Sequence, residues 1–371
     1  MVTRLAILGA TGSIGLQALD VVRSNRDRLR ITALASARNA SALDALAAET
    51  GATTIVLQER DGDDALCDLA TRDDVDLVLV ATPGIAGLAP TLAALRAGKR
   101  VALANKEVLV TGGHLVAPLA GGAGDRLRPV DSEHCALWQC LIGERVENVS
   151  RVAVTASGGP FRERALGELA SVTPDEALRH PTWKMGPKVT IDSATLANKG
   201  YEVVETHWLY GIPYDRIDIV VHPESVIHAL VEFADGSVKA QLAEPDMRLP
   251  IQYALLWDRA PSPAARLDWS RVRALRFEGA PDERRYPCLA AVLDIARSGD
   301  LAAMIGLSAA DEVAVARFLR GEVRFDEIAS YLRRGAALGS AQRAPASPDL
   351  GEILGVDRAV RTALEAAPAL A

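Results

Sequence analysis

The sequence has few cysteines, few aromatic residues and no excess of positive charge. Its 371 residues include four cysteines, 4% aromatic residues and a formal net charge of −7. The cysteines form no CxxC pair and no zinc-ligand spacing, so we expect reduced thiols in a cytosolic protein. The negative charge, without a lysine- and arginine-rich run, argues against general binding of nucleic acids.

Long apolar runs are also missing. No stretch approaches the roughly 20 apolar residues that a transmembrane helix needs. The N-terminal MVTRLAILGATGSIG is apolar but broken by glycines, and it leads into a fold motif, so it does not resemble a signal peptide. We therefore expect a soluble, cytoplasmic protein of two or three domains, because the chain is too long for one ordinary core.

A glycine-rich segment follows the first predicted strand. RLAIL at 4–8 reads as a buried strand, GATGSIG follows at 9–15, and an amphipathic helix continues to about residue 23. The glycines would let the backbone approach a pyrophosphate, and the amides of Thr11 to Ile14 would open the helix toward it. The spacing is GxxGxxG rather than GxGxxG, so a purely structural turn remains an alternative.

Further apolar stretches end near residues 36, 58, 81, 104 and 130, with helical patterns between most of them. This alternation predicts an α/β fold with a Rossmann-like parallel sheet covered on both faces. After the second strand, Arg38 stands where NAD-binding proteins usually carry an acid. A cation there favours NADPH, with its 2′-phosphate, although a solvated surface arginine is the alternative.

Polar residues gather where three of these strands end. In such sheets, ligands lie beyond the carboxyl ends of the strands. ATPG at 81–84, NKE at 105–107 and DSEH at 131–134 should share that edge. Asn105 and Glu107 sit where a nicotinamide would lie, and Lys106 between them is either a site residue or a solvated charge. The residues at 131–134 either cap the following helix or hold a cation.

The middle of the chain offers a second polar set. VAVTA at 152–156 predicts a strand followed by SGGPF, which could present amides to an anion or be a plain turn. HPTWKMGPK at 180–188 is either a lid over a ligand or a loop packed on the core. VTI at 189–191 predicts a strand, followed by a helix from about 193 to 210. Asn198, Lys199 and Glu202 share one face of that helix, as a surface ion pair or as part of a phosphate and metal site.

The C-terminal third has little chemistry in its sequence. HPESVIHAL at 222–230 runs into a predicted strand, with histidines that favour structural roles, and AEPDMRLP at 243–250 predicts a turn with Met247 near a pocket. A loop-rich linker follows, and helical patterns appear at 287–298, 301–319 and 352–366. No chemical groups cluster there, so we expect a helical buttress.

Taken together, GATGSIG, LANKE, PVDSEH, SGGPF, RHPTWKMG, DSATLANKG with Glu202, HPESVIH and EPDMR closely resemble the 1-deoxy-D-xylulose 5-phosphate reductoisomerases of the methylerythritol phosphate route to isoprenoids. These motifs run in family order from residue 9 to 248, and PCLAA with the helical tail also fits. The resemblance implies an NADPH-binding domain over 1–150 and an α+β catalytic domain over 151–256 with a mobile flap near 180–188. A linker over 257–282, a C-terminal helical domain over 283–371 and a homodimer are also implied.

The resemblance further assigns site residues. One divalent cation, Mg²⁺ or Mn²⁺, would be held by Asp131, Glu133 and Glu202, whose hard oxygens suit both ions. The catalytic set would be these three and Lys106. The substrate contacts would be Lys106, Ser132, Glu133, Ser157, His180, Trp183, Ser193, Asn198, Lys199 and Glu202. Of these, Ser157, Ser193, Asn198 and Lys199, with His180 from the flap, would bind the phosphate. NADPH would contact Thr11, Gly12, Ser13, Ile14, Ala37, Arg38, Asn39, Asn105, Glu107 and Gly186.

Two segments depart from the family pattern. Ala37-Arg38-Asn39 stands where Gly-Lys-Asn is expected, which keeps the cation but adds a methyl group near the ribose, and Pro83 stands where valine is expected. His134 has no assigned role. The implied activity is metal-assisted isomerisation of 1-deoxy-D-xylulose 5-phosphate, followed by reduction with NADPH to 2-C-methyl-D-erythritol 4-phosphate. Another NADP-dependent dehydrogenase and a catalytically silent NADPH-sensing protein are the alternatives.

Overall fold

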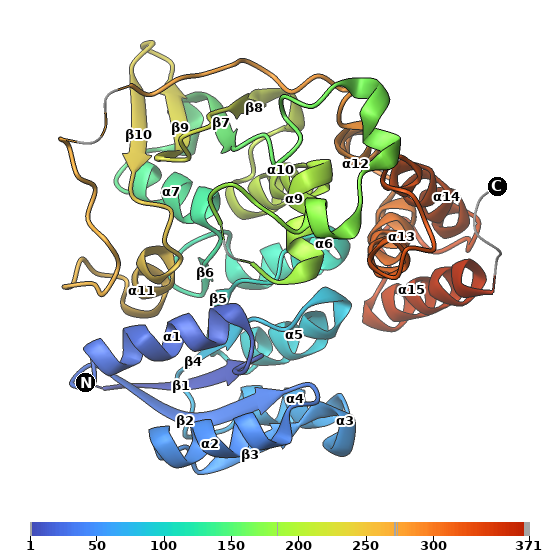
Figure 1. The fold of residues 1–371 in the computed structure, drawn as a ribbon. Coiled ribbons are helices and arrows are strands. Elements are labelled where there is room, and N and C mark those ends of the chain that lie inside the picture. The colour runs from blue at the N-terminus through green and yellow to red at the C-terminus, as the bar shows by residue number, and fades with distance from the viewer. Residues whose placement is uncertain (1, 184, 271, 273, 367–371) are drawn as a thin grey trace.

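The computed structural model describes residues 2–183, 185–270, 272 and 274–366. Its N-terminal part is a six-stranded parallel sheet in the order β3-β2-β1-β4-β5-β6 (Figure 1). The strands are β1 Thr3–Leu8, β2 Leu29–Ser36, β3 Thr54–Leu57, β4 Leu77–Val80, β5 Arg100–Leu103 and β6 Leu127–Pro129. Each ends within one residue of its predicted end, and this order is that of a Rossmann-like fold. The predicted fold class is confirmed.

Helices cover both faces of this sheet because its strands are apolar on both sides. They are α1 Ser13–Ser24, α2 Ala40–Thr50, α3 Gln58–Asp61, α4 Asp64–Thr71, η1 Gly84–Gly87, α5 Leu88–Arg96 and α6 Glu107–Ala120. Leu5 and Ile7 of β1 belong to a core with α1 and α2, whereas Ala6 and Leu8 belong to the core with α4, α5 and α6. Alternate residues thus face opposite layers.

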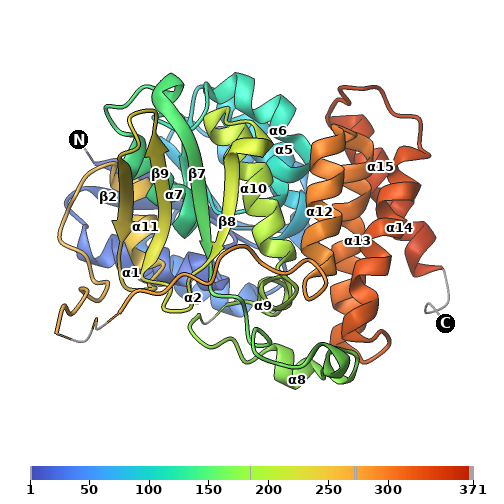
Figure 2. The ribbon, with the colours of Figure 1, turned by 90° about the horizontal axis from the view of Figure 1, so that it is seen from above.

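The second sheet has four strands in the order β10-β9-β7-β8. They are β7 Val149–Ala156, β8 Ile217–Val221, β9 Ile227–Phe233 and β10 Val238–Leu242, and only the β7–β8 pair is parallel. Two helices, α7 Ser132–Leu141 and α10 Ala197–Tyr210, pack on one face of this sheet (Figure 2). A later helix, α11 Arg248–Leu256, returns to pack on α1, so the two sheets share a boundary.

The prediction of a strand at 189–191 is wrong. These residues lie in the helix α9 Pro187–Thr195, which is separated from α10 by Leu196 in the left-handed conformation, with φ of 55°. Pro187 occupies the first turn of α9, where its fixed φ suits a helix and its missing N–H costs nothing. The β-branched residues that favoured a strand are outweighed by this start. The short elements nearby are η2 Val146–Asn148, η3 Leu166–Ser171, α8 Pro174–Ala177 and η4 Tyr214–Arg216.

The C-terminal part is a helical layer beside both sheets (Figures 1 and 2). It contains α12 Pro287–Ser298, α13 Leu301–Leu319, η5 Phe325–Glu327, α14 Ile328–Ser340 and α15 Leu350–Glu365. The sequence analysis did not predict α14, which contains Gly335 and Gly339. In the structure a Cβ at either glycine would collide with α13, so both are required by close helix packing.

The segment between α11 and α12 crosses the second sheet without a helix or strand in its described residues. Arg271 and Arg273 of the predicted linker and Lys184 of the predicted flap lie outside the described residues. The domain boundaries remain predictions. All four cysteines are free thiols. Within the described residues, no helix is long and apolar enough to cross a membrane.

Candidate active site

One pocket lies between the two sheets and gathers residues from distant parts of the chain. Its lining comes from the start of α1, the ends of β5 and β7, the start of α7, the predicted flap, and helices α9 and α10. Every residue predicted to contact substrate or metal lines it, namely Lys106, Asp131, Ser132, Glu133, Ser157, His180, Trp183, Ser193, Asn198, Lys199 and Glu202. Met247 lines it as well.

Three carboxylates converge in this pocket. Asp131, Glu133 and Glu202 each offer an oxygen, and these oxygens lie within 4.8 Å of one another. Asp131 is the N-cap of α7, and its Oδ1 accepts a hydrogen bond from the Glu133 amide at 3.3 Å. The two alternatives for the DSEH stretch are therefore compatible, since Asp131 caps the helix and also faces the other carboxylates.

Two lysines lie among these carboxylates, and we call the five residues the pocket cluster. Lys106 Nζ lies 3.0 Å from Asp131 Oδ2 and 3.4 Å from Glu202 Oε1. Lys199 Nζ lies 2.9 Å from Glu133 Oε1 and also pairs with Glu202. The predicted shared face of α10 is confirmed, because the Asn198 amide also donates to Glu202 Oε1 at 2.5 Å.

The electrostatics of the pocket cluster fit a divalent cation. Burial and the neighbouring Glu133 raise the pKa of Glu202 to about 7, which reports crowded negative charge. Burial alone would raise the pKa of Asp131, but Lys106 and His134 hold it well below its ordinary value. Three converging carboxylates, one disfavoured in its charged form, are a donor set that suits Mg²⁺ or Mn²⁺.

His134, which had no assigned role from the sequence, contacts both Asp131 and α10. Its Nδ1 lies 3.2 Å from Asp131 Oδ1 and 3.6 Å from Glu205 Oε2, and its Nε2 lies 2.9 Å from the Glu202 carbonyl oxygen. Although burial lowers it, the acids Glu205 and Asp131 raise the pKa of His134 to about 9. Sequence reasoning missed Glu205, because only the packing of α7 on α10 brings it to the imidazole.

Two residues of the predicted phosphate set, Ser157 and His180, contact each other in the pocket. Ser157 Oγ lies 3.2 Å from His180 Nε2 and accepts the Gly159 amide at 3.1 Å. His180 Nδ1 accepts the amides of Thr182 and Trp183, at 3.1 and 2.9 Å, so this imidazole organises the first turn of the predicted flap. Burial lowers the pKa of His180 to about 4, which keeps the ring neutral.

Some of the predicted cofactor residues reach the pocket. Ser13, Ile14 and Gly186 line it, and Thr11 in the glycine-rich loop has its Oγ1 2.7 Å from Ser36 Oγ. Gly12 lies in the same loop, directly before α1. A Cβ at Gly15 would collide with the Ala10 carbonyl, so close helix–strand packing requires this glycine.

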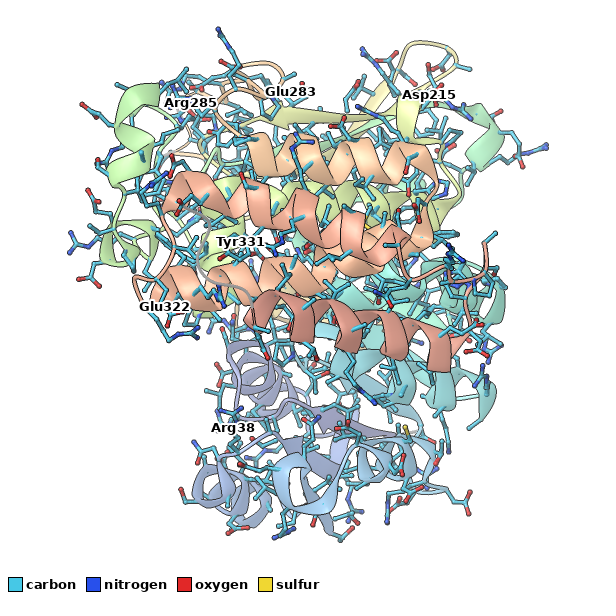
Figure 3. The ribbon with its side chains drawn as sticks, turned by 90° about the vertical axis from the view of Figure 1, so that its right-hand side faces the viewer. Arg38, Asp215, Glu283, Arg285, Glu322 and Tyr331 are labelled. Atoms are coloured by element: carbon cyan, nitrogen blue, oxygen red, sulfur yellow. The ribbon has the colours of Figure 1, made fainter. Side chains whose placement is uncertain are left out.

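The second group of cofactor residues lies at the surface beside that loop. Ala37, Arg38 and Asn39 follow β2 and are exposed, and Figure 3 shows Arg38 at the outer edge of the N-terminal part. Asn39 caps α2 by accepting the Ala42 amide at 3.1 Å. In the described part of the chain, no carboxylate forms an ion pair with Arg38, which leaves its guanidinium available for a 2′-phosphate.

Asn105 and Glu107 are not brought to the pocket. The Asn105 amide donates to the carbonyls of Thr82 and Gly84, at 2.5 and 2.7 Å, and Glu107 Oε1 lies 2.8 Å from Lys188 Nζ. The contact of these two residues with NADPH therefore stays a prediction. Their side chains, as placed here, do not support it. Pro83 has a φ of −76°, which a proline adopts without strain, and the structure gives it no functional role.

Comparison with known proteins agrees with the family resemblance seen in the sequence. Family models described as 1-deoxy-D-xylulose 5-phosphate reductoisomerase match residues 5–64 and 57–113, and models of its C-terminal domains match 127–210 and 242–363. A 1-deoxy-D-xylulose 5-phosphate reductoisomerase of Geobacillus kaustophilus is 45% identical over 96% of this chain and 97% of its own. The homologous enzyme of Thermomicrobium roseum is also 45% identical, over 96% of each chain.

Solved structures agree as well. The crystal structure of a DOX-P reductoisomerase in complex with NADPH, fosmidomycin and magnesium is 36% identical, with a TM-score of 0.91 over 98% of both chains. A reductoisomerase from Zymomonas mobilis in complex with NADPH is 38% identical, with a TM-score of 0.87 over 99% of this chain and 100% of that one. This chain belongs to the 1-deoxy-D-xylulose 5-phosphate reductoisomerase family.

Proposed function

We propose that this protein converts 1-deoxy-D-xylulose 5-phosphate into 2-C-methyl-D-erythritol 4-phosphate, using NADPH and one divalent cation. The observation that carries the proposal is the single pocket in which the carboxylates Asp131, Glu133 and Glu202 face the glycine-rich loop of a dinucleotide-type sheet. A different NADP-dependent dehydrogenase would leave this carboxylate set without a use.

The carboxylates would hold Mg²⁺ or Mn²⁺. Bound there, the cation would polarise the ketone oxygen as a Lewis acid, and NADPH would supply the hydride. The residues of the chain hold the substrate in place. Lys106, with its ammonium 3.0 Å from Asp131, stabilises negative charge or moves a proton at the sugar oxygens, beside Ser132.

The phosphate end is bound separately. Ser157, Ser193, Asn198 and Lys199, with His180, present hydroxyl, amide, ammonium and imidazole groups to the phosphate oxygens. Trp183, whose ring centroid lies 6.3 Å from that of His228, lines the pocket from the flap and would exclude water from the bound sugar. Lys199 now pairs with Glu133 and Glu202, so its phosphate contact requires the cation to take over those carboxylates.

The state of assembly is also a proposal. We infer a cytoplasmic homodimer that binds a small sugar phosphate and neither nucleic acid nor membrane. The outer side of the second sheet supports an interface, because Val238 of the edge strand β10 and Phe277 of the crossing segment are 53% and 46% exposed. Light scattering coupled to gel filtration measures the mass directly, and a monomer would contradict this part.

The activity is tested by the loss of NADPH absorbance with 1-deoxy-D-xylulose 5-phosphate, with added Mg²⁺ or Mn²⁺ and after chelation. We expect turnover only with the cation. Binding of NADPH without turnover would favour the NADPH-sensing alternative, and turnover of a hydroxy acid or a semialdehyde would favour another dehydrogenase. A phosphonate hydroxamate should inhibit, because its two ends match the phosphate residues and the cation.

A further inference from the structure

A second cluster of buried charges lies behind the pocket, and the proposed chemistry does not use it. Lys188 of α9 has its Nζ 2.8 Å from Glu107 Oε1, 2.7 Å from Asp192 Oδ2 and 2.8 Å from Asp311 Oδ2. None of these four residues lines the pocket, and we call them the closed cluster. Asp311 comes from α13, so the C-terminal helices do contribute a charged group, contrary to the sequence-based expectation.

Lys188 is the cation on which the closed cluster depends. The side chains of Asp192 and Asp311 are 1% and 0% exposed, and among the described residues their oxygens have no hydrogen-bond partner beyond this ammonium. Burial and Asp311 raise the pKa of Asp192 well above its ordinary value, which keeps a proton in the cluster. Because an unpaired buried charge is strongly unfavourable, the three carboxylates fix where Lys188 lies.

The members of the closed cluster stand next to predicted site residues in the sequence. Glu107 follows Lys106, Asp192 precedes Ser193, and Lys188 follows Gly186 and Pro187 at the end of the flap. Lys106 and Ser193 line the pocket, whereas Glu107 and Asp192, their neighbours in the chain, face the closed cluster. A shift of the closed cluster would therefore shift the pocket wall.

The predicted flap has a side-chain contact at each end. At its start, His180 Nε2 lies 3.2 Å from Ser157 Oγ. At its end, the chain enters α9, whose second residue is Lys188. Through Asp311 this second attachment reaches α13, which packs against α6 and α9.

We propose that Lys188 and Asp311 are positioning residues for substrate binding, which hold the end of the flap and the helix bearing Ser193 in the arrangement that binds the phosphate. The proposal rests on the proposed function, which assigns the phosphate to Ser193 and His180. Lys106 is held separately, by Asp131, Asn198 and Glu202. Loss of the closed cluster should therefore affect binding more than the chemical step.

The test compares Lys188→Met with the wild type. When the binding-competent arrangement becomes a smaller fraction of the population, the apparent Kd rises by the same factor. We expect the KM for 1-deoxy-D-xylulose 5-phosphate to rise about tenfold or more, with kcat changed less than about threefold. The affinity for a phosphonate hydroxamate, measured by calorimetry with Mg²⁺ and NADPH, should fall by a similar factor.

Arg361→Met is the matched control. Arg361 is 25% exposed, close to the 22% of Lys188, and it pairs with Glu312 at 2.9 Å and Asp357 at 2.7 Å. Neither carboxylate lines the pocket. The control variant should lose thermal stability but keep its KM within about twofold of the wild type, since it removes no attachment of the flap.

The outcomes separate this inference from the proposed function. A folded Lys188→Met protein with unchanged KM and inhibitor affinity would overturn the inference, as would an equal rise in KM in Arg361→Met. If the Lys188→Met protein fails to fold, the Asp311→Asn variant tests the inference instead, because it leaves no charge unpaired. It should weaken inhibitor binding about threefold or more, and unchanged binding would overturn the inference. Inhibitor binding needs no turnover, so a wild type that binds but does not turn over contradicts the proposed function alone.

Discussion

The pocket cluster and the closed cluster are made of the same kinds of side chain, and their surroundings distinguish them. The first has two lysines and three carboxylates at an open cavity, and the second has one lysine and three carboxylates between packed helices. Both carry more carboxylates than cations, and in both one carboxylate, Glu202 or Asp192, has a raised pKa. The pocket cluster can relieve its negative charge by binding a cation from solvent, whereas in the closed cluster burial and Asp311 raise the pKa of Asp192 and so favour its protonated form. The exposure of the carboxylates, more than composition, distinguishes the two clusters, because Asp131 and Glu133 are 16% and 15% exposed whereas Asp192 and Asp311 are 1% and 0% exposed.

The largest expected difference comes from replacing one carboxylate with its amide in each cluster. Glu202→Gln should lower kcat by on the order of 10²–10³, because it removes a charged ligand at the reacting centre. Asp192→Asn should keep kcat within about threefold, since the amide resembles the protonated acid that burial already favours. Steady-state kinetics with saturating Mg²⁺ measure both. NADPH affinity should be unchanged in Glu202→Gln, and near-normal activity in that variant would contradict its role as a ligand.

Stabilisation by metal gives the next contrast. A ligand that binds only the folded state stabilises it by about 2.7 kcal/mol at 100 times its Kd. Mg²⁺ should therefore raise the melting temperature of the wild type and of Lys188→Met, but not that of Glu202→Gln. Thermal unfolding with Mg²⁺ and with a chelator is the measurement. Loss of the Mg²⁺ effect in Lys188→Met would show that the pocket cluster needs the closed cluster in order to bind the cation, and the distinction between the clusters would fail.

The sequence predicted the pocket cluster far better than the closed cluster, for a physical reason. The strands of the first sheet are short apolar runs that end in glycine or polar residues, so their ends and their shared edge could be read directly. Asp131 and Glu133 follow such an end, whereas the addition of Glu202 depended on resemblance to a family. Lys188 and Asp311 carry no local signal, because their partners are chosen by how α9 and α13 pack. The helix α14 was missed for the same reason, since its glycines are required by packing on α13. The start of α9 at Pro187 was a local signal, but the β-branched residues after it favoured a strand.

Two tyrosines, one beside each cluster, give a smaller contrast in stability. Tyr210 lies beside the pocket cluster, and its hydroxyl donates to the His134 carbonyl at 2.5 Å. Tyr201 lies beside the closed cluster with Lys188 Nζ 5.2 Å from its ring centroid, and its buried hydroxyl has no hydrogen-bond partner among the described residues. Tyr210→Phe should lower the free energy of unfolding by about 1 kcal/mol, while Tyr201→Phe should be neutral or stabilising. Denaturant unfolding measures both, and an equal loss would mean that the Tyr201 hydroxyl is satisfied in solution.

The smallest effect is the pH dependence that Asp192 gives to stability. Its pKa in the folded protein lies well above the ordinary value, because of burial and the nearby Asp311. Between the two values the folded state binds more protons than the unfolded state, so this group makes stability fall as pH rises through that interval. The Asp192→Asn variant has no titratable group at this position, so its stability should not fall with pH in this way. The difference in melting temperature between the variant and the wild type should therefore grow in favour of the variant from pH 4 to pH 8, by a few degrees at most. A difference that stayed constant with pH would mean that Asp192 is ionised in the folded protein. The closed cluster, with one lysine for three charged carboxylates, would then hold more negative charge than the pocket cluster, with two lysines for three.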